Sequence, residues 1–123
     1  MGRYDFFSQH KHKLVTTMTN HTVALDGEGY LLNLQDWTPE LAEHLAKDVD
    51  VEMSDAHWEI IYLLREFYQE FEVSPAMRPL VKAVNKKLGV EKGRSIYLMT
   101  LFPGSPPKLA AKIAGLPKPA NCL

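Results

Sequence analysis

The chain has one residue that can act as a sulfur nucleophile, Cys122, and it lies one position from the C-terminus. We call residues 115–123 the C-terminal arm; they carry prolines at positions 117 and 119. Proline lacks a backbone N–H and clashes with the preceding turn, so the arm cannot continue a helix. Its prolines favour an extended, stiff backbone, with a reach of roughly 30 Å at about 3.3 Å per residue. We expect the arm to stand off from the domain and to present Cys122 to another protein.

The chemistry open to a thiol at this position is limited. A free cysteine is most often buried as a small hydrophobe, but the arm offers little to bury it against, and a terminal thiol without a role is the alternative. The thiolate is the reactive form; Lys118 would favour it, and the terminal carboxylate of Leu123 would oppose it. A cysteine hydrolase is excluded, because it needs a base and an oxyanion hole around a rigidly held nucleophile. Activation is therefore expected to come from a partner.

Histidines are the other candidate ligands. His10 and His12 could bind a metal, but no third ligand lies near them in the sequence, so a zinc site is not supported. His44 and His57 fall within expected helices, where we predict surface or core-edge positions. We predict no metal and no organic cofactor.

A glycine-rich turn at 89–95 raises a different possibility. It departs from a phosphate-binding loop, being one residue short between its glycines and carrying Arg94 in place of lysine. The helices expected on either side, 75–88 and 92–102, could instead form a helix-turn-helix with Lys86, Lys92 and Arg94 facing phosphates. Short helix pairs joined at glycine are common, so nucleic-acid binding stays an alternative function.

The elements that must position these residues are a small sheet and about five helices. β-rich stretches around an Asp-Gly turn predict a three-stranded antiparallel meander, at 14–17, 22–25 and 30–32. Three helix starts pair a capping hydroxyl with proline at the first helical position: Thr38-Pro39, Ser74-Pro75 and Ser105-Pro106. The expected helices are 39–48, a helix from Ser54 to Phe71, 75–88, 92–102 and 106–114. The predicted fold class is α+β, mainly helical.

Apolar spacing predicts which faces of these helices are buried. On the helix opening at Ser54 the predicted core face is Ile60, Leu63, Leu64, Phe67 and Phe71. On the helix at 92–102 it is Ile96, Met99 and Phe102. Pro79 is expected to distort the first turns of the helix at 75–88.

Length and composition predict one domain of ordinary globular character, with 46% hydrophobic and 24% charged residues. We divide the chain into an N-terminal extension at 1–13, a domain at 14–114 and the arm at 115–123, with Met1 or Met18 as the start. The N-terminus lacks the apolar segment of a signal peptide, and a single cysteine fits a reducing compartment. We expect a cytoplasmic protein that does not enter the membrane.

Charge is divided unevenly along the chain. Residues 1–73 carry five basic and 14 acidic side chains, whereas residues 74–123 carry nine basic side chains and one acidic. The two parts could neutralise each other within the fold, or the C-terminal part could face an acidic partner.

From about Asp26 to its end the chain resembles the DsrC/TusE family. The matching segments include His57-Trp58-Glu59, Arg65-x-Phe67-Tyr68, Ser74-Pro75-Ala76-x-Arg78, Glu91-Lys92-Gly93, Leu101-Phe102-Pro103 and Lys112-Ile113-Ala114-Gly115-Leu116-Pro117-Lys118-Pro119-x-x-Cys122. The resemblance implies a three-stranded meander on a set of helices with a mobile C-terminal arm. It also implies a sulfurtransferase in which Cys122 carries sulfur as a persulfide or exchanges thiols.

The resemblance further implies a division on a second cysteine eleven positions upstream, where this chain has Ala111. That places it with TusE-like members, which take sulfur from a TusBCD-type complex and pass it to a tRNA 2-thiouridylase for wobble uridine 2-thiolation. A DsrC-like partner or regulator of sulfite or sulfur metabolism is the alternative. Direct tRNA contact, the oligomeric state and the roles of Lys112 and Lys118 stay open.

Overall fold

Two strands, a 3-10 helix and five α-helices make up the part of the chain that the computed structural model describes, residues 13–16 and 22–120. They are β1 (Lys13–Thr16), β2 (Thr22–Leu25), η1 (Leu34–Asp36), α2 (Pro39–Asp48), α3 (Asp55–Phe71), α4 (Met77–Leu88), α5 (Ser95–Leu101) and α6 (Pro106–Ile113). The mainly helical class and the five predicted helices are confirmed. No helix in these residues is long and apolar enough to cross a bilayer. Apart from Lys13, the predicted extension lies outside them.

The sheet is smaller than the predicted meander. β1 and β2 pair antiparallel, with Lys13 opposite Leu25 and Thr16 opposite Thr22. The third predicted strand, at 30–32, is reduced to an isolated bridge between Leu25 and Leu31. The chain then leaves the sheet, because η1 begins at Leu34.

The turn between β2 and this bridge is built on Asp26. Its Oδ1 accepts the backbone N–H groups of Glu28 at 2.8 Å and of Tyr30 at 2.9 Å. Gly29 has a φ of +93°, a left-handed conformation that side chains other than glycine rarely adopt. The predicted Asp-Gly turn is confirmed, and the Asp26 carboxylate fixes its shape.

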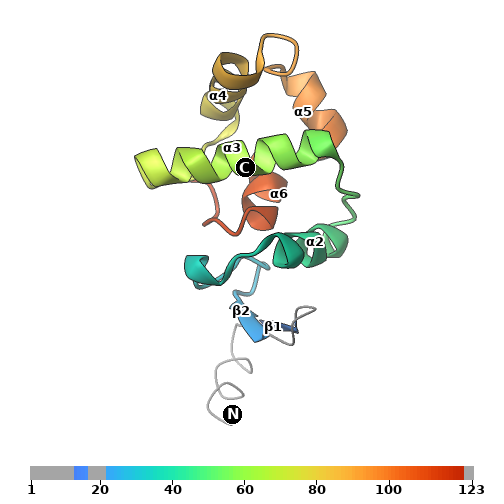
Figure 1. Ribbon diagram of the computed structural model, residues 1–123, viewed down its shortest axis with the longest axis vertical. Helices are drawn as coiled ribbons and strands as arrows, with labels where there is room; N and C mark the ends of the chain where they lie inside the picture. The colour runs from blue at the N-terminus through green and yellow to red at the C-terminus, as the bar shows by residue number, and fades with distance from the viewer. Residues whose placement is uncertain (1–12, 17–21, 121–123) are drawn as a thin grey trace.

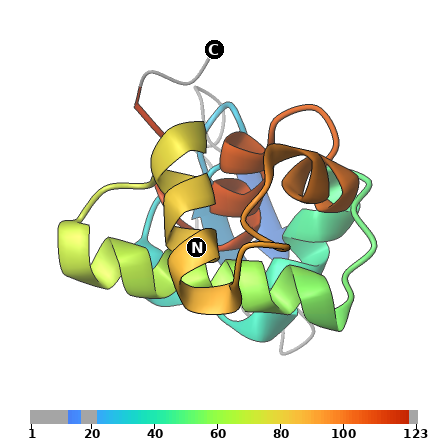
Figure 2. The same cartoon turned by 90° about the horizontal axis from the view of Figure 1, so that it is seen from above.

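Helix α6 occupies the centre of the fold. It packs against α2, α3, α4 and α5. Figure 1 shows α6 between α2 and α3, with the sheet at one end of the molecule and α4 and α5 at the other. In the view from above, α6 lies between α4 and α5 (Figure 2). Because the C-terminal arm continues directly from α6, the arm starts from the interior of the domain.

Two hydrophobic clusters stabilise this arrangement, since buried apolar surface is the main favourable term in folding. The larger joins α2, α3, α4, α5 and α6, and its fully buried members include Ala42, Ile60, Ile61, Leu64, Leu80, Val84, Leu98, Phe102, Ala111 and Ile113. The smaller joins β2 to α2 through Val23, Leu25, Leu31, Leu41 and Leu45. Trp37 packs against both clusters.

Two of the predicted helix starts are confirmed by their caps. Thr38 Oγ1 accepts the N–H of Leu41 at 3.1 Å, and Pro39 occupies the first helical position of α2. At the start of α3 the N–H of Ser54 donates to Nδ1 of His57 at 3.1 Å, as one half of a capping box. These contacts satisfy backbone groups that a helix end leaves without partners.

The predicted start of α4 is wrong by two residues. The helix begins at Met77 with Ala76 as its N-cap, and Ser74 does not cap it. Pro79 is the third residue of α4, and it lies in the first turn, where an N–H has no helical partner. Pro79 therefore removes no helical hydrogen bond, so the reason for expecting it to distort α4 does not apply.

Two predicted faces are right in part. Phe102 is buried as predicted, and so are Ile60, Leu63 and Leu64 of α3. On α5 the buried side chain is Leu98, followed by buried Phe102, while Ile96 is 75% and Met99 40% exposed. With seven residues α5 completes less than two turns. Leu98 and Phe102, four positions apart, are fully buried, and Tyr97 and Leu101 pack partly buried beside them. On α3 the outer residue Phe71 is 54% exposed, and Ile61 is buried instead.

Gly93 provides a test of the α4–α5 connection. A Cβ at this residue would lie 2.4 Å from Cα of Asn85, and backbone cannot give way there. We expect Gly93→Ala to lower the free energy of unfolding by about 1–3 kcal/mol through overpacking, measured by urea denaturation. Glu91→Ala, an exposed change in the same turn, should stay within about 0.5 kcal/mol of wild type. Equal stability of both variants would contradict the close approach.

Candidate functional site at the base of the C-terminal arm

The predicted catalytic residue, Cys122, lies outside the described residues. The structure describes the arm from Gly115 to Ala120. These residues form the segment that leads to the thiol.

Helix α6 ends in a Schellman motif that sets the direction of the arm. Gly115, with a φ of +72°, donates its N–H to Lys112 O at 3.2 Å. Leu116 donates its N–H to Ala111 O at 2.9 Å, and its side chain is only 2% exposed. This is the pattern by which a left-handed glycine closes a helix and satisfies its last carbonyls. The predicted helix end at Gly115 is confirmed.

Two side chains hold the last carbonyls of α6 from outside the helix. Trp37 Nε1 donates to Ile113 O at 2.9 Å, and Arg65 Nη1 donates to Ala114 O at 2.7 Å. The Arg65 guanidinium carbon lies 4.0 Å from the centre of the Trp37 ring, a cation–π distance. The positive charge also suits the negative end of the helix dipole. We call Trp37 and Arg65 the clamp.

Burial has a cost for the charged member of the clamp. Loss of hydration lowers the pKa of Arg65, and the nearby Tyr62 acts in the opposite direction. The Tyr62 and Trp37 rings pack in a T-shaped arrangement with ring centres 6.0 Å apart. Arg65 keeps its charge at neutral pH, because a guanidinium group loses its proton only in strongly basic solution. A charged donor to a helix carbonyl forms a stronger hydrogen bond than a neutral one.

The clamp also explains why position 115 is glycine. A Cβ at Gly115 would lie 2.4 Å from Cδ1 of Trp37. The residue thus has two independent reasons to be glycine: its positive φ and the indole against its backbone.

The next residues of the arm lie on the domain surface. Ser74 Oγ donates to Pro117 O at 2.5 Å, Lys118 Nζ lies 3.1 Å from Glu28 Oε2, and Pro119 is buried. The prediction that the arm stands off from Gly115 is therefore wrong for residues 115–119. Proline prevents a helix there, but it does not prevent burial of apolar side chains or hydrogen bonding to arm carbonyls.

The histidines have structural positions in the described part of the chain. His57 is buried, and its Nε2 lies 2.8 Å from Leu101 O, so the ring links α3 to the end of α5. His44 lies on α2 and is half-buried. His10 and His12 fall outside the described residues, within which no group of three metal-ligating side chains occurs.

A family model described as DsrC-like protein matches residues 17–123 of the chain. The chain belongs to the DsrC-like family. The match includes the whole arm and Cys122, so the family resemblance deduced from the sequence is confirmed.

Curated relatives of similar length have related names. A sulfurtransferase TusE homolog of Haemophilus influenzae is 54% identical over 82% of this chain and 93% of its own. The sulfurtransferase TusE of Photorhabdus laumondii is 52% identical over 82% of this chain and 91% of its own. These similarities support a sulfurtransferase role in a sulfur relay.

Solved structures of DsrC proteins share the fold. The solution structure of Allochromatium vinosum DsrC is 48% identical, covers 91% of this chain and 99% of that chain, and superposes with a TM-score of 0.83. The oxidized γ-subunit of the dissimilatory sulfite reductase of Archaeoglobus fulgidus is 35% identical, with coverage of 92% and 99% and a TM-score of 0.75.

Sequence reasoning missed the clamp. Arg65 lies in a segment that matches the family, but the sequence assigns it no role. Trp37 precedes the helix start at Thr38 and carries no prediction. One signal was available: a tryptophan that is largely buried usually finds an acceptor for its N–H. What the sequence could not show is that this acceptor lies 76 positions away, at Ile113.

Replacing Trp37 by phenylalanine tests the clamp. The variant keeps a large aromatic ring but leaves Ile113 O without its donor, so we expect a loss of about 1–2 kcal/mol in unfolding free energy. Amide hydrogen exchange at Gly115 and Leu116 should become faster than in wild type. The matched control is Tyr62→Phe, which keeps its ring contacts and should change neither quantity. Unchanged exchange at both amides in Trp37→Phe would show that the clamp does not hold the arm.

Proposed function

We propose that this protein is a sulfur carrier that accepts a persulfide sulfur on Cys122 from a TusBCD-type complex. It passes this sulfur to a tRNA 2-thiouridylase for 2-thiolation of the wobble uridine. The carrier works in the cytoplasm, where a reducing environment keeps a lone cysteine as a thiol.

The observation that carries this proposal is the position of the sole cysteine relative to the clamped helix end. The arm is fixed to the domain as far as Pro119 by the burial of Leu116 and Pro119 and by the hydrogen bond to Pro117 O. Cys122 follows Pro119 by three residues, a reach of roughly 10 Å at about 3.3 Å each. A partner that binds the domain surface beside Pro119 is therefore within reach of the thiol.

The transfer step balances without an added oxidant or reductant. The Cys122 thiolate attacks the outer sulfur of the donor persulfide, and a new sulfur–sulfur bond forms while the donor's bond breaks. The donor cysteine leaves as a thiolate with the electron pair of the broken bond. Attack on the Cys122 persulfide by an acceptor thiolate repeats the same exchange. The carrier therefore needs a sequence of two partners and no cofactor.

Ala111 supports the choice of the TusE-like branch. The resemblance implies a second cysteine at this position in DsrC proteins that serve sulfite reductase. Here the Ala111 side chain is fully buried, and its carbonyl accepts the N–H of Leu116. With no second thiol in the chain, Cys122 cannot discharge its sulfur by forming an internal disulfide, and the acceptor must come from another protein.

A second candidate, a DsrC-like partner or regulator in sulfite or sulfur metabolism, is favoured by the solved relatives. One of them is named as a subunit of dissimilatory sulfite reductase. In that function the arm binds its partner without moving sulfur toward tRNA. Loss of wobble 2-thiouridine in cells that lack this chain would support the relay, and unchanged thiolation would favour this second candidate.

The helix-turn-helix alternative assigns α4 and α5 to nucleic acid. One of its predicted phosphate ligands, Lys92, is engaged within the fold: its Nζ lies 2.8 Å from Glu59 Oε1 on α3, and this hydrogen bond raises the pKa of Lys92. The alternative predicts DNA affinity that falls steeply with salt and survives removal of 121–123. The relay predicts loss of sulfur transfer in the same truncated chain, which keeps the buried Leu116 and Pro119.

Sulfur loading tests the role of Cys122. After incubation with a cysteine desulfurase, cysteine and the donor complex, intact mass spectrometry should show one added sulfur atom on the wild-type chain. Cys122→Ser should show none, because no other thiol exists in the chain. The control is Leu123→Ala, which changes the neighbouring residue, keeps the thiol and should load like wild type. Equal labelling of Cys122→Ser would overturn the mechanism.

A further inference from the structure

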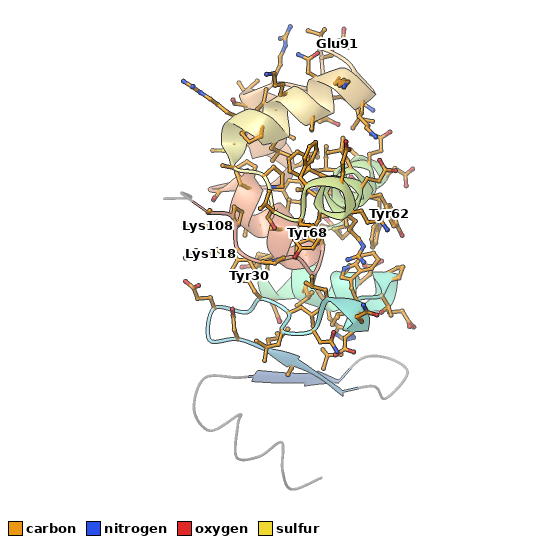
Figure 3. The ribbon with its side chains drawn as sticks, turned by 90° about the vertical axis from the view of Figure 1, so that its left-hand side faces the viewer. Tyr30, Tyr62, Tyr68, Glu91, Lys108 and Lys118 are labelled. Carbon is orange, nitrogen blue, oxygen red and sulfur yellow. The ribbon has the colours of Figure 1, made fainter. Side chains whose placement is uncertain are left out.

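A surface hollow of about 550 Å³ lies beside the base of the arm. It is bounded by α6, the chain before α6, the turn after β2 and the arm itself, with Tyr30, Ser105, Lys108, Lys112, Lys118 and Glu28 among its lining residues. Figure 3 shows Lys108, Lys118 and Tyr30 together on one side of the molecule, whereas Tyr62 lies on the other side in this view. We call this feature the basic hollow.

The basic hollow has an excess of positive charge. Three lysines line it against one acidic residue, Glu28. Lys108 and Lys112 are four positions apart on α6, so they share a helix face. Like charges at this spacing destabilise a helix, and α6 contains no acidic residue that would offset them. Lys112 lies in the last turn of α6, where its charge suits the helix dipole, but Lys108 gains no such stabilisation, and the pair suits the binding of an anionic partner.

Local contacts shape the hollow without neutralising it. Lys112 Nζ lies 5.0 Å from the centre of the Tyr30 ring, a contact that leaves its charge in place. Lys118 pairs with Glu28, but the side chains are 41% and 61% exposed. Exposed ion pairs of this kind contribute little to stability. An incoming carboxylate can therefore take the place of Glu28 at small cost.

The second lysine-rich surface of the described residues differs in this respect. A groove between α3 and α4 is lined by Lys82, Lys86 and Lys87, but also by Glu66 and Glu70. Lys87 Nζ lies 3.1 Å from Glu66 Oε1. Two glutamates accompany the three lysines there, against one in the basic hollow, so the groove provides a control with a smaller excess of positive charge.

The position of the hollow connects it to the transfer step. Lys118 belongs both to the lining and to the arm, four residues before Cys122. That separation spans at most roughly 13 Å at about 3.3 Å per residue. Any protein seated in the hollow is therefore within reach of the thiol.

Its charge favours one partner over the others. A protein that holds tRNA must present basic groups to the phosphates, and the lysines would repel such a surface. RNA itself binds along rows of cations that follow its backbone, whereas this hollow is a single concave site with a carboxylate on its rim. An acidic loop of a protein fits better, because carboxylate side chains can reach individual lysines.

We propose that the basic hollow is the docking site for an acidic segment of the protein that donates sulfur to Cys122. This inference rests on the proposed relay, and it adds the surface and the charge by which the donor is recognised. Lys108 and Lys112 act as docking residues and take no part in sulfur–sulfur bond exchange.

The test compares two charge-reversed variants of the full chain: Lys108→Glu/Lys112→Glu in the hollow and Lys82→Glu/Lys86→Glu on α4. Both change the net charge by the same amount, and thermal unfolding establishes that each is folded. The probe is the purified TusBCD-type complex, with Kd measured by calorimetry at low and high salt. We expect the hollow variant to bind roughly tenfold more weakly or worse and the α4 variant to stay within about twofold.

Each outcome has a defined meaning. Equal Kd for wild type and the hollow variant, or equal weakening by both variants, overturns the proposal. The proposal is also overturned if the hollow variant loses affinity for an anticodon stem-loop RNA while it keeps its affinity for the TusBCD-type complex. A separate experiment loads the wild-type chain with cysteine persulfide. Intact mass spectrometry then shows whether Cys122 accepts sulfur. Lysine-dependent docking without any loading would reject the relay and keep the docking site.

Discussion

The contact of Trp37 with the end of α6 is the interaction on which the rest of the structure depends. The indole packs against both hydrophobic clusters, and its N–H donates to Ile113 O. It thereby links the cluster under the sheet to the larger cluster, beside the direct packing of α2 on α6. Arg65 completes the clamp from α3. Without the clamp, the carbonyls of Ile113 and Ala114 at a buried helix end would lose their side-chain donors. Such a loss is costly where water reaches poorly.

This constraint gives the arm a defined origin. The Schellman motif at Gly115 and the burial of Leu116 and Pro119 fix the path of the arm across the domain. Fixing it during folding, rather than during an encounter, lowers the entropy lost when a partner binds. A carrier must meet a donor and an acceptor in turn, so a preset origin for Cys122 benefits both encounters in the proposed relay.

The uneven distribution of charge along the sequence can be followed in the fold. Six of the nine basic residues in the C-terminal part of the chain lie at two surfaces of the fold. On α4 the lysines face glutamates of α3 and one forms an ion pair. Beside the arm, Lys108 and Lys112 face a single acidic residue. The two interpretations of the charge asymmetry, internal neutralisation and an acidic partner, therefore apply to different surfaces of one molecule.

Local sequence chemistry was sufficient to determine most elements of this protein. The caps at Thr38 and Ser54, the turn at Asp26 and the helix end at Gly115 depend on residues within a few positions of one another, and they were predicted. The thiol at Cys122, the absence of a second cysteine and the family resemblance also come from sequence alone.

Tertiary structure decided the features that depend on residues far apart in the chain. Ser74 follows the pattern of a helix cap, yet its hydroxyl donates to Pro117 O, 43 positions away. Ile96 and Met99 have helical spacing, but α6 packs on the other face of α5. The arm's prolines predicted an extended backbone, but not the clamp and the buried contacts that hold its base, because those depend on which surfaces the fold brings beside it.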